Sequence, residues 1–164
     1  MLNWGCTIIM KRLIILRGPA GSGKTTVCET LVYKLGEGNT CVLDLDITYP
    51  DENLFERNLE KCLKVNHVIG MMFYGNSHTT NPQWLNQFRA LEHKIVSFNL
   101  LASKEICFQR CLNDSNTGRH PINKDKAMIY KYHDDFYKRE KESPLSVIAG
   151  ICEIKIKTEG KSQI

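Results

Sequence analysis

The segment that most restricts the fold of this chain is Gly18–Thr25, which reads G-x-x-x-x-G-K-T. The apolar run Leu13–Leu16 precedes it, and a helix-compatible stretch, Lys24–Leu35, follows it. A strand, a glycine-rich turn and a helix in this order bring backbone N–H groups together around a polyphosphate, and the helix dipole adds to the attraction. The setting therefore predicts a phosphate-binding loop, or P-loop, rather than a chance glycine-rich turn.

The chemistry of this loop assigns a role to each of its polar residues. Lys24 is expected to reach the β- and γ-phosphates of a nucleoside triphosphate, and the Thr25 hydroxyl is expected to ligate Mg²⁺. The predicted nucleotide-binding residues are Gly18, Pro19, Ala20, Gly21, Ser22, Gly23, Lys24, Thr25 and Thr26.

Hydrophobic patterning along the rest of the chain alternates between strands and helices. Strands are predicted at Arg12–Arg17, Thr40–Asp46, His67–Tyr74, Lys94–Leu101 and Gly150–Lys157. Helices are predicted at Lys24–Leu35, Asp51–Lys64, Gln83–Glu92, Ser103–Leu112 and Lys124–Lys141. Such alternation predicts an α/β fold, with a parallel sheet covered by helices on both faces and its ligands at the carboxyl ends of the strands.

Length and composition indicate one domain without a membrane segment. The 164 residues suit a single domain, taken as 11–164, with residues 1–10 as an N-terminal extension. No apolar run reaches the roughly 18 residues of a membrane span, and the first residues do not resemble a signal peptide. The net charge of +4 lies in the second half, and it is too weak to establish nucleic-acid binding.

Seven scattered cysteines contain no C-x-x-C pair, and no clustered histidines complete a zinc site around them. Free thiols are typical of the reducing cytoplasm, so a cytoplasmic location is expected. No obligate protein partner is evident.

Polar side chains at the strand ends supply the remaining candidates for catalysis. Asp46 stands at the end of the second predicted strand, where a carboxylate holds Mg²⁺ or accepts a proton from a substrate hydroxyl, and Asp44 shares its face. Arg110 precedes a turn-rich segment at about 113–123 and Arg119 lies within it, and this segment is predicted to be a lid over the nucleotide. Either arginine suits a transferring phosphoryl group, although a solvated surface loop is the alternative.

With these features in place, the chain resembles the P-loop kinases of the polynucleotide kinase, adenylylsulfate kinase and gluconate kinase type, over about residues 11–160. The segments that carry the resemblance are Arg17–Thr26, V-L-D-L-D at Val42–Asp46, L-L-A-S-K-E-I-C-F-Q-R at Leu100–Arg110, Arg119 before Pro121, and the closing Lys155–Thr158.

The resemblance implies a three-layer P-loop NTPase fold with a five-stranded parallel sheet in the order 2-3-1-4-5. It also implies ATP and Mg²⁺ as cofactors, Lys24 and Thr25 on the triphosphate and the metal, Asp46 as base, and Arg119 with Arg110 as lid charges. The loop after the last strand is implied to lie near the base. Where these kinases often carry an arginine after the strand-end aspartate, this chain has Ile47, Thr48 and Tyr49, so the acceptor stays open.

Three functions remain in competition. The leading hypothesis is a kinase that moves the γ-phosphate of ATP to a hydroxyl of a nucleic-acid end, a nucleoside or a small metabolite. The alternatives are a non-kinase P-loop NTPase and a catalytically inactive nucleotide-binding protein. Motor-type and switch-type NTPases usually place a carboxylate after an apolar strand, and the third predicted strand lacks one.

Overall fold

A computed structural model describes residues 10–45, 51–72, 83–116, 125–142 and 149–159. Within these ranges, five strands form one parallel sheet in the order β2-β3-β1-β4-β5. The strands are β1 (Arg12–Arg17), β2 (Thr40–Asp44), β3 (His67–Met72), β4 (Lys94–Leu101) and β5 (Cys152–Lys157). The predicted fold class and strand order are therefore confirmed.

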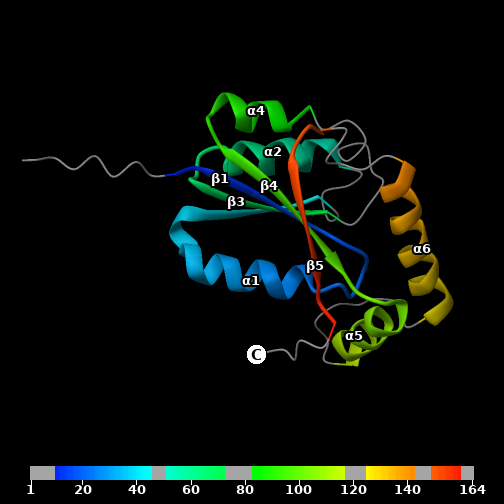
Figure 1. Ribbon diagram of the computed structural model, residues 1–164. Helices are drawn as coiled ribbons and strands as arrows, with labels where there is room; N and C mark the ends of the chain where they lie inside the picture. Colours follow the sequence, from blue (N-terminus) through cyan, green and yellow to red (C-terminus); the bar gives the residue numbers. More distant parts are fainter. Residues whose placement is uncertain (1–9, 46–50, 73–82, 117–124, 143–148, 160–164) are drawn as a thin grey trace, which may run out of the picture.

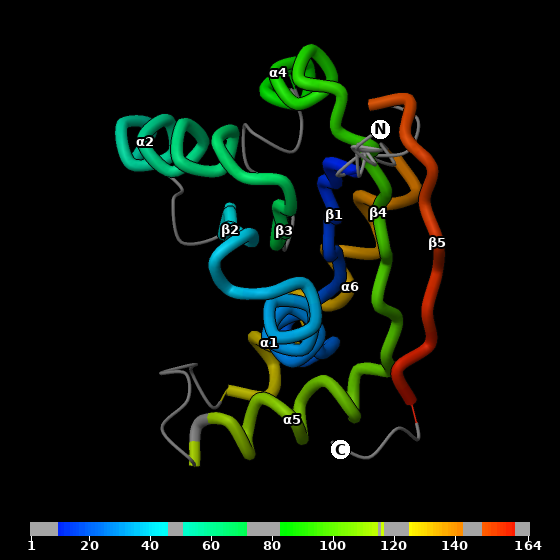
Figure 2. Tube along the Cα trace, turned by 90° about the vertical axis from the view of Figure 1, so that its left-hand side faces the viewer, coloured from blue at the N-terminus to red at the C-terminus, as the bar shows by residue number. Residues whose placement is uncertain are grey.

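Helices cover both faces of this sheet. They are α1 (Lys24–Leu35), α2 (Glu52–Cys62), α4 (Leu85–Ala90), α5 (Lys104–Asn116) and α6 (Lys126–Glu142), with a short 3₁₀ helix, η1 (Glu37–Asn39), after α1. Figure 2 shows α1 on one side of the sheet, with α2 and α4 on the other. In Figure 1, α6 stands beyond the sheet at the end toward which β1 and β4 run.

The alternating side chains of β1 are buried on both faces. Leu13 and Ile15 belong to the core that includes Phe55 of α2 and Phe88 of α4. Ile14 and Leu16 belong to the core on the α1 side. A strand enclosed in this way has little freedom, so the loop that follows it is held in place at the carboxyl end of the sheet.

The start of α2 follows from a capping residue, whereas α5 continues beyond its predicted end. Asp51 marks the start of α2 as expected: it is the capping residue just before the helix, and its Oδ1 accepts a hydrogen bond of 3.0 Å from the Leu54 N–H. Helix α5 was predicted to end near Leu112, which is wrong: it continues to Asn116. The low helix propensity of residues 113–116 is a weak effect, because each residue added to an existing helix gains a backbone hydrogen bond.

The first residues of the predicted lid, 113–116, therefore belong to a helix, and 117–124 lie outside the described residues. In the part of the chain that the structure describes, no helix is long and apolar enough to cross a membrane.

Candidate functional site

The P-loop leaves β1 at Gly18 and is pressed against α5. Gly21 has a φ of 75°, in the left-handed region that favours glycine. A Cβ on Gly21 would lie 2.2 Å from the carbonyl oxygen of Cys107 on α5. Both the backbone conformation and this close approach require glycine, so α5 forms the wall behind the loop.

Helix α1 starts at Lys24, within the loop motif, and has no side-chain cap. Gly23, just before the helix, has a φ of 100° and makes no side-chain capping hydrogen bond. The first N–H groups of a helix have no partner within the helix, and they attract anions together with the helix dipole. Thr25 and Thr26 are exposed at this end of α1.

The Lys24 ammonium lies over the same loop. Its Nζ donates hydrogen bonds to the carbonyl oxygens of Gly18, at 2.8 Å, and Pro19, at 3.2 Å. A positive side chain, an uncapped helix start and an exposed threonine hydroxyl are the donor set that suits a polyphosphate with its magnesium ion. The residues of this loop therefore fit the nucleotide and metal that the motif predicts.

Arg110 lies against the backbone of the P-loop. Its Nη1 donates to the carbonyl oxygens of Gly21, at 3.3 Å, and Ser22, at 3.5 Å. The same guanidinium contacts Thr158, directly after β5, through Nη1 to Oγ1 at 3.1 Å and Nη2 to the carbonyl oxygen at 2.6 Å. The structure thus brings Arg110 to the loop, but its described partners are carbonyl and hydroxyl oxygens.

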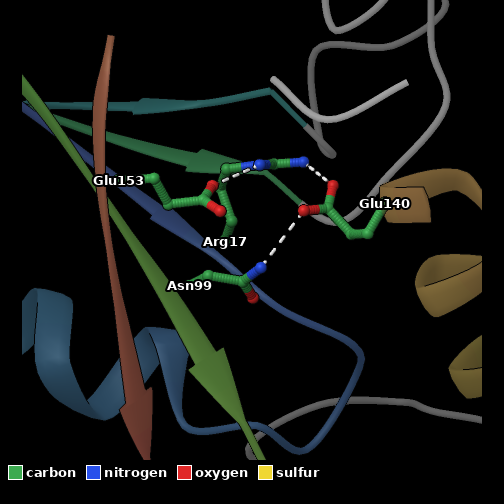
Figure 3. A network of polar contacts seen from close by, with 4 residues as sticks. All are labelled: Arg17, Asn99, Glu140 and Glu153. Carbon is green, nitrogen blue, oxygen red and sulfur yellow. Dashed lines mark hydrogen bonds and ion pairs between the residues drawn. The ribbon is translucent and has the colours of Figure 1, made fainter. Parts of the chain in front are cut away.

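A buried ionic network surrounds Arg17, the last residue before the P-loop (Figure 3). Its Nη1 donates to Glu153 Oε2 on β5 at 2.6 Å, and its Nη2 is paired with Glu140 Oε1 on α6. The second oxygen of Glu140 accepts a hydrogen bond of 3.1 Å from Asn99 Nδ2 on β4. Through Arg17 and Glu140 together, three strands and α6 therefore meet at the entrance of the loop.

The network places two carboxylates around Arg17, a residue that is only 7% exposed. Burial raises the pKa of Glu140, and the opposing attraction of Arg17 lowers it less. The sequence reasoning missed this network. Arg17 and Glu153 are 136 positions apart, and no spacing rule connects them.

The end of β2 is described as far as Leu45, so Asp46 lies outside the described residues. Asp44 is half-buried on the α1 side, close to Cys28. The pKa of Cys28 is raised to about 11, mainly by burial of the thiol and next by the negative charge of Asp44. Among the described residues, no three His, Cys, Asp or Glu side chains gather in a way that would hold a metal ion. The described part of this edge therefore offers Asp44, while the position of Asp46 stays a prediction.

Arg119 and the polar loop after β3 also lie outside the described residues. Of the predicted catalytic residues, the structure thus brings Lys24 and Arg110 to carbonyl oxygens of the same P-loop.

Comparison with solved structures finds chains of the same architecture. A proposed kinase from Chloroflexus aurantiacus has a TM-score of 0.65 at 16% identity, with 94% of this chain and 93% of that chain covered. Shikimate kinase from Acinetobacter baumannii, in complex with shikimate, has a TM-score of 0.52 at 20% identity, with 93% and 87% covered. A gluconokinase from Sinorhizobium meliloti 1021 has a TM-score of 0.53 at 12% identity, with 94% and 86% covered.

At these identities, the likeness establishes the fold alone. No family model matches the sequence, and no curated protein is similar to it. The chain has a P-loop kinase-like fold, and the polynucleotide or adenylylsulfate kinase type is not confirmed.

Proposed function

We propose that this chain is a Mg²⁺-dependent kinase that transfers the γ-phosphate of ATP to a hydroxyl group. The observation that carries the proposal is the P-loop itself. Glycines whose positions leave no room for a side chain, an uncapped helix start and the Lys24 ammonium meet at the end of a buried strand. This arrangement supports triphosphate binding. The kinase-like fold and the lack of a carboxylate after the third predicted strand favour transfer over a motor or switch cycle.

The proposed mechanism gives each predicted residue a defined role. Lys24 and the P-loop amides bind the phosphates, and Thr25 with Asp46 would hold Mg²⁺, which neutralises phosphate charge when bound. Asp46 also accepts the proton of the acceptor hydroxyl. Arg119 contributes positive charge to the transferring group, as would Arg110 once its guanidinium turns from the loop carbonyls toward phosphate.

The acceptor is the open part of this proposal. The three hydroxyl classes considered are nucleic-acid ends, nucleosides and small metabolites, and shikimate and gluconate join the last class because similar structures are kinases with those names. A cytoplasmic setting is proposed with it, supported by the free thiols of the cysteines that the structure describes.

The test incubates the full chain with γ-labelled ATP, Mg²⁺ and separate acceptors: 5′-hydroxyl oligonucleotides, nucleosides, shikimate, gluconate and other polyols. Label on one acceptor class, lost in Lys24→Ala and in Asp46→Asn, would establish the kinase and name its substrate. Label released only to water would favour the NTPase. Tight ATP binding without turnover, unchanged by Asp46→Ala, would favour the inactive nucleotide-binding protein.

A further inference from the structure

Two cysteines meet at the edge of the sheet, away from the P-loop. Cys41 lies on β2, the edge strand, and Cys62 is the last residue of α2. The thiol of Cys62 donates a hydrogen bond to the sulfur of Cys41 at 2.6 Å. Cys62 is fully buried, whereas Cys41 is half-buried, so a small molecule from solvent reaches the Cys41 sulfur first.

The environment gives these two sulfurs different protonation states. The hydrogen bond from Cys62 lowers the pKa of Cys41 to about 7, with a further contribution from the nearby Lys61 charge and with burial acting in the opposite direction. The same hydrogen bond and burial raise the pKa of Cys62. Near neutral pH, Cys41 therefore carries a substantial thiolate fraction, and Cys62 keeps its proton.

The other buried cysteines that the structure describes lack this combination. Burial raises the pKa of Cys28 to about 11 and that of Cys107 to about 12, and it also raises the pKa of Cys111. Neutral buried thiols react slowly with oxidants, because the thiolate is the nucleophile. Position and protonation thus separate the pair from these three.

We propose that Cys41 and Cys62 form a reversible disulfide when the protein meets hydrogen peroxide. The Cys41 thiolate attacks one peroxide oxygen, the O–O bond breaks, and the departing hydroxide takes up a proton to become water. The Cys62 sulfur then loses its proton and attacks the Cys41 sulfenic acid, whose S–O bond breaks as a second water leaves. Two electrons pass from the two sulfurs to the peroxide.

The cross-link would join the two elements that flank residues 46–50. These residues connect β2 to α2, and they include Asp46. Under the proposed function, the oxidised protein would transfer phosphate at a changed rate, because the cross-link would close the stretch of chain from Cys41 to Cys62, which includes the proposed base. This effect on transfer rests on the proposed function, whereas formation of the disulfide does not.

The experiment treats the full chain with hydrogen peroxide, alkylates the remaining thiols under denaturing conditions, and maps the peptides without reduction. We expect a peptide pair joined through Cys41 and Cys62, the loss of two hydrogen atoms from the intact mass, and recovery of both thiols with dithiothreitol. Cys152→Ser, which removes an exposed cysteine, is the matched control and should form the same cross-link.

The variants Cys41→Ser and Cys62→Ser should each abolish this cross-link. Mapping of the wild-type chain decides the question even where a variant fails to fold. The proposal is overturned by sulfinic acid at Cys41 with a free Cys62 thiol, by a cross-link between other cysteines, or by no loss of thiols. Since thiol mapping needs no turnover, it separates failure of this proposal from failure of the kinase proposal.

Discussion

Arg110 donates from Nη2 to the Thr158 carbonyl oxygen at 2.6 Å and from Nη1 to the Thr158 hydroxyl at 3.1 Å. The Thr158 hydroxyl in turn donates to the carbonyl oxygen of Ser22 at 3.1 Å. One arginine therefore ties α5 to the residue after β5 and, through it, to the P-loop. These contacts hold the end of β5 and α5 in a fixed position against the phosphate-binding loop.

Replacing Arg110 by lysine tests this link. Lysine keeps the charge but loses the planar fork that reaches several oxygens at once. We expect Arg110→Lys to weaken ATP binding about tenfold, corresponding to roughly 1.4 kcal/mol, measured by titration with a fluorescent ATP analogue. Arg57→Lys, at an exposed position on α2, is the control. An unchanged dissociation constant for Arg110→Lys, or an equal loss in the control, would contradict the link.

Gly21 offers a test of the loop itself. In Gly21→Ala, the new Cβ would lie 2.2 Å from the Cys107 carbonyl oxygen, and the residue would keep a φ of 75°. Since either the loop or α5 must shift, we expect ATP binding to fall at least about tenfold and the unfolding free energy to drop by about 1–3 kcal/mol. Isothermal titration calorimetry and urea unfolding measure the two effects.

The matched control is Gly38→Ala in η1, where an added Cβ meets no atom within 4 Å. We expect this variant to bind ATP as the wild type does. Equal ATP affinity for the two alanine variants would mean that the P-loop tolerates a side chain at Gly21, and the geometric argument for this loop would fail.

The sequence predicted the central elements well where local chemistry determines them. The bounds of β1, α1 and β4 agree with the prediction to the residue: the P-loop separates β1 from α1, Gly36 ends α1, and Lys94 starts the apolar run of β4. The end of α5 was missed, since polar residues suggested a turn where the helix continues.

The surroundings of the loop could not be read from the chain in the same way. Arg17 meets Glu140 and Glu153 only because the sheet and α6 bring together residues more than a hundred positions apart. Arg110 was predicted to act on a phosphate, and no sequence pattern indicated its contacts with Thr158. Such contacts follow from tertiary packing, which no spacing along a single chain encodes.

Asp46 is the predicted base, and Asp44 is the neighbouring carboxylate against which it can be compared. We expect Asp46→Asn to lower turnover by about a hundredfold or more, the usual range for loss of a general base, with little change in ATP affinity. Asp44→Asn should have a smaller effect on turnover. Steady-state rates with the identified acceptor and ATP titrations measure both. Loss of turnover in Asp44→Asn alone would transfer the proposed role to Asp44.

The Arg17 network predicts how stability depends on pH. Burial raises the pKa of Glu140 in the folded protein above its ordinary value of 4.5. As the pH rises from the ordinary pKa of Glu140 through its higher pKa in the folded protein, the unfolded chain releases the proton first. Glu140 therefore contributes progressively less to the unfolding free energy. The difference in unfolding free energy, wild type minus Glu140→Gln, should therefore be larger at about pH 5 than at about pH 7.5, measured by urea unfolding at both values.

Glu142→Gln, at an exposed position at the end of α6, supplies the comparison, and its difference from the wild type should change little with pH. The groups that face Glu140 include Arg17, Glu153 and Lys155, and they are present in both variants. If the wild-type advantage over Glu140→Gln instead grows as the pH rises, attraction to Arg17 outweighs burial. Glu140 would then be a stabilising carboxylate at neutral pH, and the folded-state pKa would lie below its ordinary value.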